Sequence, residues 1–129
     1  MLDYVLVCGS RSWRDGEPIH DRIRQLHPSI TVVQGGAQGV DLLARGWAWR
    51  LGMGVVTVRP DYRRHGVSAP YRRNEKMADL MPSLCIAFWD GKSRGTKHMI
   101  KVCQDRGIPV EIHYSDGTVE QQLPLFAAG

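Results

Sequence analysis

The sequence has few cysteines and no long apolar run. Cys8, Cys85 and Cys103 are an odd number without CxxC spacing, and two of them lie in apolar segments that we predict to be buried strands. We therefore interpret them as small core residues of a protein from a reducing compartment, not as a disulfide framework. No apolar run approaches the ~20 residues that a membrane helix needs, and no signal peptide is recognisable. We expect a cytoplasmic protein.

Several motifs of known chemistry are also absent. Neither the GxGxxG spacing of a dinucleotide-binding fold nor the GxxxxGK[ST] spacing of a P-loop occurs, so we infer neither NAD-dependent redox chemistry nor a Mg²⁺ site. The histidines show no paired ligand spacing and have no cysteines at zinc-finger intervals. No Ser-His-Asp or Cys-His set follows from the spacing either. We therefore assign no metal and no cofactor.

Length and charge limit the remaining possibilities. The chain has 129 residues, 43% of them hydrophobic, which suits one domain with a full core and leaves no room for a second catalytic domain. Any site must lie on that domain or across a dimer. The formal net charge of +4 is mild, whereas a nucleic-acid footprint is normally larger and concentrated on one face.

Short β-branched runs alternate along the chain with segments of helical spacing. Alternating strands and helices form a parallel sheet covered on both faces, with right-handed crossovers. The sequence therefore predicts an α/β fold, a Rossmann-like three-layer domain with a mainly parallel sheet of about five strands. We predict strands at residues 4–8, 31–34, 55–58, 84–88 and 110–113, and helices at residues 16–26, 40–51, 71–80 and 96–106.

Two further features concern the helix at residues 40–51 and the end of the chain. The helix has an apolar stripe and is followed by Gly52, a typical residue after a helix end. Asp116-Gly117 is a turn signal, and the residues after it show no useful periodicity, so we divide the chain into a domain at 1–114 and a turn and tail at 115–129. The stripe comprises Leu42, Leu43, Trp47, Ala48 and Leu51.

The most informative pattern is a set of three glycine-bearing turns, each directly after a short apolar run, at residues 9–11, 35–39 and 91–96. In an open parallel sheet such turns lie at the carboxyl edge, where glycine lets the backbone approach a ligand and helix N-termini direct N–H groups at anionic oxygens. The turns predict a site for a phosphate-bearing small molecule. The expected ligand-binding residues are Gly9, Ser10, Arg11, Gly35, Gly36, Ala37, Gly39, Asp41, Gly91, Ser93, Arg94, Gly95 and Thr96.

Individual residues of these turns leave alternatives open. Arg11 suits bidentate binding of phosphate, but a tight turn with a surface arginine gives the same pattern. Asp41 lies where it can bond either ribose hydroxyls or the loop backbone. Trp13 either covers the site or packs in the core, and Asp15 is interpreted as a helix cap. Lys97 and His98 oppose the dipole of the helix that they begin, which favours a bound anion there.

A further group of basic residues follows the third predicted strand. Arg72 and Arg73, with Arg63 and Arg64 upstream, form either a solvated face or part of the same site. Asn74 and Glu75 are placed to orient these guanidinium groups. We include Arg73 and Asn74 among the ligand-binding residues.

Four motifs in order resemble the SLOG superfamily, in particular its YspA/SRK-like single-domain branch, over residues 4 to 113. The resemblance implies a Rossmann-like fold with a nucleotide or ADP-ribose-like ligand at the turns named above. Relatives include the LOG-type phosphoribohydrolases, the DNA-processing protein A group and nucleotide sensors of anti-phage systems. The motifs are Gly9-Ser10-Arg11-x-Trp13, Gly35-Gly36-Ala37-x-Gly39-Val40-Asp41, Arg73-Asn74-x-x-Met77 and Gly91-Lys92-Ser93-Arg94-Gly95-Thr96 with Met99-Ile100.

The resemblance to the LOG-type enzymes is incomplete. Arg73 and Met77 match their Arg-x-x-x-Met segment, which makes Arg73 the candidate catalytic residue. Their Pro-Gly-Gly is absent, and Met99 occupies the position of their glutamate. A thioether cannot act as a general acid or base, so the phosphoribohydrolase hypothesis is weakened, although Glu75 or Asp41 could replace the missing carboxylate.

The end of the chain resembles a different kind of motif. Gln122-Leu123-Pro124-Leu125-Phe126 is similar to the pentapeptide with which bacterial replication and repair proteins dock on the DNA sliding clamp. Its expected partner-binding residues are Gln122, Leu123, Leu125 and Phe126. A segment packed on its own domain, or chance, explains the pattern equally well.

Three functional hypotheses follow. The first is a sensor or ligand-binding module for a nucleotide or ADP-ribose-like molecule. The second is a nucleoside-monophosphate phosphoribohydrolase. The third is a DNA-metabolism adaptor that docks on the sliding clamp. No membrane partner is expected, and a homo-oligomer remains open.

Overall fold

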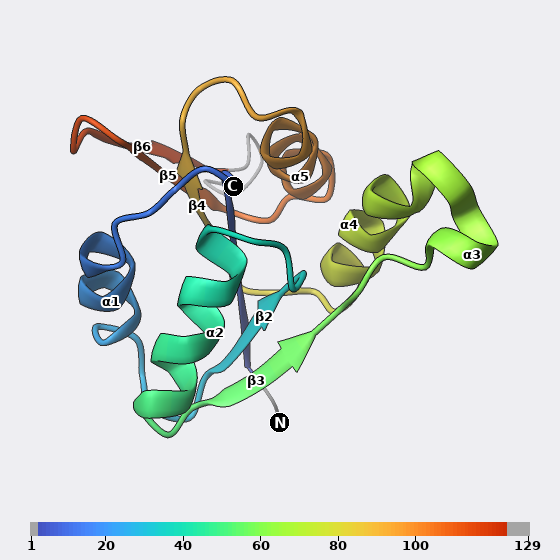
Figure 1. The fold of residues 1–129 in the computed structure, drawn as a ribbon. Helices are drawn as coiled ribbons and strands as arrows, with labels where there is room; N and C mark the ends of the chain where they lie inside the picture. Colours follow the sequence, from blue (N-terminus) through green and yellow to red (C-terminus); the bar gives the residue numbers. More distant parts are fainter. Residues whose placement is uncertain (1–2, 124–129) are drawn as a thin grey trace.

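A computed structural model describes residues 3–123 of the chain. One six-stranded sheet runs through the molecule in the order β3-β2-β1-β4-β5-β6, with β6 antiparallel and all other strands parallel (Figure 1). The elements are β1 (Tyr4–Gly9), α1 (Glu17–Ile23), β2 (Thr31–Gln34), α2 (Val40–Arg50), β3 (Gly54–Thr57), α3 (Tyr62–His65), the 3₁₀ helix η1 (Gly66–Ser68), α4 (Ala69–Asp79), β4 (Leu84–Trp89), α5 (Arg94–Asp105), β5 (Val110–Tyr114) and β6 (Val119–Gln122).

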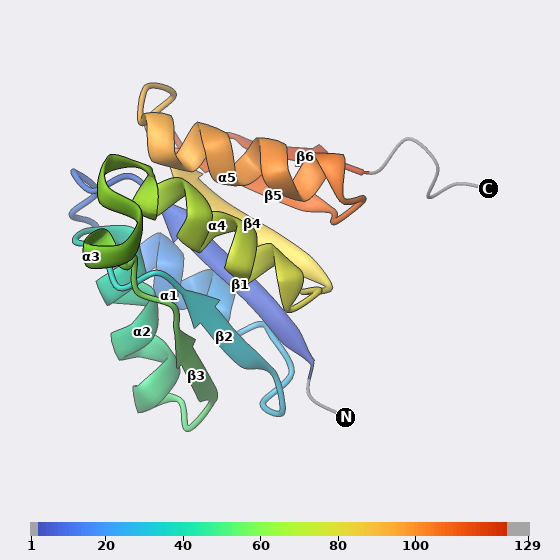
Figure 2. The ribbon, with the colours of Figure 1, turned by 90° about the vertical axis from the view of Figure 1, so that its right-hand side faces the viewer.

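Helices cover both faces of the sheet, as the sequence predicts. Figures 1 and 2 show α1 and α2 on one face and α4 and α5 on the other. The alternation of side chains along β1 explains how one strand serves both layers. Val5 and Val7 pack with α1 and α2, whereas Leu6 and Cys8 pack with α4 and α5. The Rossmann-like α/β fold is therefore confirmed.

The packing of α2 differs from the predicted apolar stripe. The fully buried apolar residues of α2 are Val40, Ala44 and Ala48, while Leu42 is 38% exposed. These small buried residues let α2 lie close to the sheet. The larger side chain of Leu42 does not fit between α2 and the sheet and is partly exposed. Gly52 follows the helix with φ +72°, as expected of a residue after a helix end.

Part of the segment that the sequence analysis assigned to a tail is a strand. Val119–Gln122 forms β6, which pairs with β5 so that Glu111 lies opposite Gln121. The turn between them is stabilised by Asp116, whose carboxylate accepts a bond from the Thr118 N–H at 2.9 Å. Most of β6 is exposed and polar, so backbone pairing stabilises it without any apolar periodicity that a sequence pattern could reveal.

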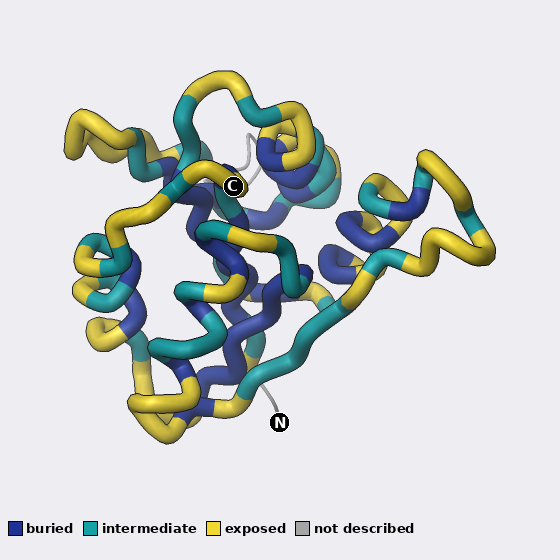
Figure 3. Tube along the Cα trace, in the orientation of Figure 1, coloured by how far each residue is buried: buried dark blue, intermediate teal, exposed yellow. Residues whose placement is uncertain are grey.

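The segment between β3 and α4, for which the sequence analysis predicted neither a strand nor a helix before residue 71, contains the short helices α3 and η1. Asp61 accepts a bond from the Arg64 N–H at 3.1 Å and so caps the single turn of α3. This segment extends away from the sheet, and its residues are mostly exposed (Figure 3). Within residues 3–123, no helix is long and apolar enough to cross a membrane.

Candidate functional site

A cavity of about 510 Å³ lies at the carboxyl edge of the sheet. Four segments line it: the end of β1 with the turn after it, the turn after β2 with the start of α2, η1 with α4, and the first turns of α5 with the residue before them. Because β1, β2 and β4 are parallel neighbours, their following turns meet at this edge, as the three glycine turns predicted.

Not every residue expected at the site lines the cavity. Ser10, Gly35, Gly36, Gly39 and Gly91 lie outside the lining. The expected residues that line it are Gly9, Arg11, Ala37, Asp41, Arg73, Asn74, Ser93, Arg94, Gly95 and Thr96.

Two glycines of the turn after β2 are required by contacts within the protein. A Cβ on Gly35 would lie 2.3 Å from Nη1 of Arg73, and a Cβ on Gly39 would lie 2.4 Å from the backbone oxygen of Ser10. Gly39 also has φ +80°, which side-chain-bearing residues rarely adopt. These glycines therefore allow the turns to pack against one another and against Arg73.

Asp41 occupies the group of N–H donors after β2. Its Oδ2 atom accepts bonds from the N–H groups of Gly35 at 3.1 Å and Ala37 at 3.2 Å, while the Gly36 N–H donates to Gln34 Oε1 at 2.7 Å. Of the two alternatives for Asp41, the structure shows the bonds to the loop backbone. A side-chain carboxylate thus fills the position that an external anion would take at such a turn.

Burial sets the ionisation of Asp41. It raises the pKa of the carboxyl group from 3.8 to about 6, against the opposing effects of the Ala37 N–H bond and the charge of Arg73. At pH 7 the Asp41 carboxyl group is therefore mostly ionised, and it takes up a proton as the pH falls through about 6. Asp41 is also the one carboxylate among the described residues that line the cavity.

Arg73 is a buried cation with an 8% exposed side chain. Its Nη1 donates to the Gly35 carbonyl at 2.7 Å and its Nε donates to Asn74 Oδ1 at 3.0 Å. Among the described residues, its Nη2 has no hydrogen-bond partner, and the side chain lines the cavity. Burial lowers the pKa of the guanidinium, yet arginine remains charged at neutral pH.

Asn74 links α4 to the start of α5, and its orientation follows from its partners. Arg73 Nε can only donate, so the Asn74 atom that faces it is the oxygen. The amide nitrogen then donates to the Gly95 carbonyl at 3.3 Å and to His98 Nδ1 at 3.1 Å. His98 must accept at Nδ1, which places the proton of the neutral ring on Nε2. Burial lowers the pKa of His98, in agreement with a neutral ring.

The turn before α5 is organised by Asp90 and Ser10. Asp90 Oδ1 accepts bonds from the N–H groups of Lys92 and Ser93, both at 2.8 Å, and these bonds lower the pKa of Asp90 to about 2. The hydroxyl of Ser10 accepts a bond from the Asp90 N–H at 3.0 Å and is 1% exposed. Ser10 therefore joins two turns within the protein and does not face the cavity.

The first turn of α5 leaves backbone donors available at the cavity. The helix runs over 12 residues, and its N-cap residue Ser93 makes no side-chain capping bond. The first N–H groups of a helix have no partner within it, and the N–H groups of Gly95 and Thr96, at the positive end of α5, form no hydrogen bond with any described residue. Arg11 and Arg94 belong to the same lining.

Sequence reasoning missed several lining residues. They carry no charge and belong to no glycine turn, so only Tyr71, an aromatic residue directly before the Arg72-Arg73 pair, gave a usable signal. Met99 lines the cavity while 1% exposed, and the Glu75 side chain lies outside the lining. The residues missed are Cys8, Ser12, Val67, Pro70 and Tyr71, whereas Met77 and Met99, which also line the cavity, already belong to the motifs of the family resemblance.

Trp13 and Asp15 are structural. The Trp13 ring packs edge-on against Phe88, with ring centroids 5.7 Å apart, and its Nε1 donates to the Asp15 carbonyl. The carboxylate of Asp15 accepts a bond from the Glu17 N–H at 3.1 Å at the start of α1. Trp13 is therefore part of the packing between the first turn and β4.

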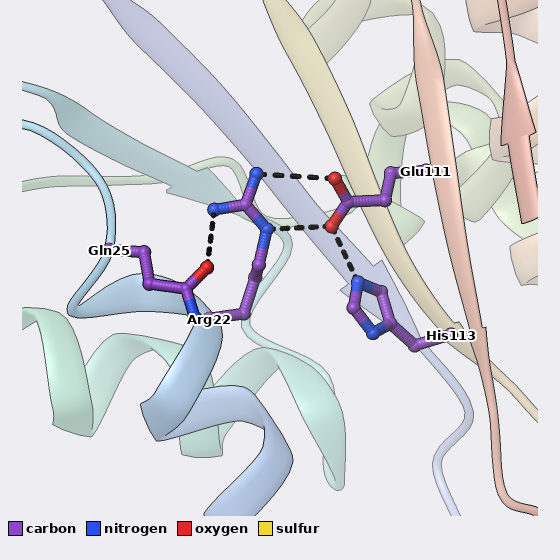
Figure 4. A network of polar contacts seen from close by, with 4 residues as sticks. All are labelled: Arg22, Gln25, Glu111 and His113. Atoms are coloured by element: carbon purple, nitrogen blue, oxygen red, sulfur yellow. Dashed lines mark hydrogen bonds and ion pairs between the residues drawn. The ribbon is translucent and has the colours of Figure 1, made fainter. Parts of the chain in front are cut away.

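Figure 4 shows a second polar cluster, none of whose residues lines the cavity. Arg22 of α1 donates through Nε and Nη2 to Glu111 of β5, at 2.7 and 3.2 Å, and Glu111 also contacts His113. The His113 bond, followed by the Arg22 contacts, lowers the pKa of Glu111 to about 2. This cluster joins α1 to the sheet and contributes nothing to the cavity lining.

The fold and the cavity define a Rossmann-like α/β protein with a positively charged recess at the carboxyl edge of its sheet. Residues 4–65 match the family described as "YspA, cpYpsA-related SLOG family". The Gene 61 protein of Mycobacterium phage D29 is 38% identical over 121 residues, which cover 87% of this chain and 96% of that protein. The chain belongs to the SLOG family.

A solved structure has the same fold. DNA processing protein A from Streptococcus pneumoniae matches 88% of this chain with a TM-score of 0.72 and 19% sequence identity. The matched region is 50% of that protein, so this chain spans half of its length. At this level of identity the likeness establishes the fold.

Proposed function

We propose that the chain binds a phosphate-bearing nucleotide or ADP-ribose-like molecule in this cavity, as a sensor or ligand-binding module. One observation carries the proposal: Gly95 and Thr96, whose N–H groups form no hydrogen bond within the described residues, line the same cavity as Arg11 and Arg94. Helix N-terminal N–H groups and arginine forks are the two donors that phosphate oxygens prefer.

Charge and size support the proposal. The described lining contains three arginines, Arg11, Arg73 and Arg94, and one carboxylate, Asp41, so a bound anion relieves an excess of positive charge. The volume of about 510 Å³ falls within the range of roughly 300–1,000 Å³ that small-molecule sites occupy. Membership of the SLOG family supports the same class of ligand. The turn after β2 is not the proposed phosphate site, because Asp41 already uses its donors.

Binding without turnover is the form of the proposal that the residues favour. Met99 lies in the lining at the position where the resemblance to LOG-type enzymes implies a glutamate. Asp41 is the one carboxylate of the described lining, and two backbone N–H groups hold its Oδ2 atom. Arg73 is likewise engaged by Gly35 and Asn74. A hydrolase needs a free acid or base near the scissile bond, and this lining supplies none in an evident position.

Replacing Gly95 by leucine tests the proposal directly. Gly95 belongs to the cavity lining and a Cβ there meets no atom within 4 Å, so we expect a leucine side chain at this position to be accommodated and to obstruct the ligand. We expect at least a roughly tenfold loss of affinity for adenosine 5′-monophosphate in calorimetry, with unchanged or slightly higher thermal stability because glycine is a poor helix former.

Gly46→Leu is the matched control, because Gly46 is also helical, has no atom within 4 Å of its Cβ position and lies outside the lining. It should bind adenosine 5′-monophosphate as the wild type does. Equal affinity of Gly95→Leu and Gly46→Leu would contradict the placement. If the wild type binds neither adenosine 5′-monophosphate nor ADP-ribose at millimolar concentration, the proposed function fails.

A second proposed function is docking on a bacterial sliding clamp. Leu123, directly after β6, is 71% exposed, which suits a residue that fills a partner's groove. Gln122 is already engaged by Gln104 of α5 and by Glu120, at 3.0 Å from Glu120 Oε1, so docking would have to break these contacts. Pro124, Leu125 and Phe126 lie outside the described residues.

A peptide of residues 120–127 tests the clamp hypothesis. We expect micromolar binding to a bacterial sliding clamp in fluorescence anisotropy, and loss of binding in a peptide with Leu125→Ala and Phe126→Ala, because large apolar side chains supply most of the affinity of such peptides. If the unchanged peptide does not bind at high micromolar concentration, the hypothesis should be abandoned.

A further inference from the structure

The cavity lining is chemically divided. The start of α5 and the turn after β1 contribute N–H groups and guanidinium groups, whereas the start of α4 and the residues before it contribute Val67, Pro70 and Tyr71. A free phosphate or a simple sugar phosphate needs only the first of these surfaces. The second surface suits a flat, apolar part of the ligand.

Tyr71 is held in place although its side chain is 42% exposed. Its ring lies edge-to-face with the ring of His98, with centroids 4.8 Å apart and an angle of 82° between the planes. His98 is fixed in turn by the Asn74 amide, which donates to Nδ1. A preorganised aromatic ring at a cavity wall lowers the entropy cost of stacking a ligand on it.

Val67 and Pro70 extend the same wall. Val67 is 96% exposed, yet it belongs to the cavity lining. It stands in η1, within the exposed segment between β3 and α4 that extends away from the sheet (Figure 3). Val67 is therefore an apolar side chain that is accessible to a ligand at this wall.

We infer that Tyr71, with Val67 and Pro70, binds the base of a nucleotide whose phosphate lies at the start of α5, so that Tyr71 determines selectivity for nucleotides over sugar phosphates. This inference rests on the proposed function, and it adds that the apolar wall contacts the base of the ligand. Stacking on an aromatic ring tolerates different bases, so the wall selects for a base without choosing among bases.

The experiment compares two probes, adenosine 5′-monophosphate and ribose 5-phosphate, which share the phosphate and the ribose but differ by the base. The wild type should bind the nucleotide roughly tenfold more tightly than the sugar phosphate. Tyr71→Ala should remove that preference and leave the affinity for ribose 5-phosphate unchanged, while Tyr71→Phe should retain it. Trp49→Ala is the control, because Trp49 is an aromatic residue that is 60% exposed and lies outside the lining.

The outcomes separate this inference from the proposed function. The assignment of the base to Tyr71 is wrong, and the phosphate site is unaffected, in either of two cases. In the first, ribose 5-phosphate binds and the base adds no affinity; in the second, Tyr71→Ala keeps the full preference for the nucleotide. If neither probe binds to the wild type, both fail. Melting curves of the Tyr71 variants show whether the domain remains folded, and the unchanged affinity for ribose 5-phosphate provides a second check of the same point.

Discussion

Arg73→Met should lower the free energy of unfolding by about 3 kcal/mol. The substitution removes the donors to the Gly35 carbonyl and to Asn74 Oδ1, and it removes the positive charge that opposes the effect of burial on Asp41. An unpaired carbonyl and a buried carboxylate without its neighbouring charge both disfavour the folded state. Denaturant unfolding at pH 7 measures the loss.

Arg72→Met is the matched control for this prediction. Arg72 is the preceding residue of α4 and its side chain is exposed, so the change should stay within about 0.5 kcal/mol of the wild type. If the two variants are equally stable, Arg73 does not hold the β2 turn and α4 together in the way that its contacts indicate.

The loss in Arg73→Met should also depend on pH. Burial raises the pKa of Asp41 to about 6 in the folded protein, so the stability linked to this group is present below its unfolded value of 3.8 and is lost as the pH rises through 6. Without Arg73 the pKa of Asp41 rises further, and the loss continues to higher pH. The deficit relative to the wild type is therefore expected to be larger at pH 7.5 than at pH 5, and an NMR titration of the Asp41 carboxyl group should show the higher pKa.

Gly39→Ala should destabilise the protein by more than about 3 kcal/mol. Its Cβ would lie 2.4 Å from the Ser10 oxygen and 2.6 Å from the Arg11 oxygen, and both are backbone atoms that cannot rotate away. The turns after β1 and β2 would have to separate, and α2 would lose its start. Thermal unfolding followed by circular dichroism measures the effect.

Gly52→Ala separates the two reasons for this cost. Gly52 has φ +72° and open space around its Cβ position, so alanine there experiences the unfavourable backbone conformation without a clash. We expect a loss of only about 1 kcal/mol. A similar loss for Gly39→Ala would mean that the two turns are not in close contact.

The alternation of β-branched runs with helical spacing was sufficient to predict the parallel sheet, its two helical layers and the edge at which the turns meet. These features depend on patterns within a few residues: the short β-branched run of β1, the terminating Gly52, and glycine turns directly after strands. The edge strand β6 escaped detection because its stability comes from pairing with β5 and not from an apolar pattern of its own.

Only the tertiary structure decided what each residue of the turns does. Composition shows that Gly35, Asp41 and Arg73 are suited to an anion site, but it cannot show that Asp41 takes the donors of its own loop or that Arg73 reaches a carbonyl 38 positions away in the chain. Such bonds join segments that are distant in sequence, and they are chosen by the packing of α2 and α4 against the sheet. The polar groups at the start of α5 and the Tyr71 ring remain accessible at the cavity, because the packing of the helices does not engage them fully.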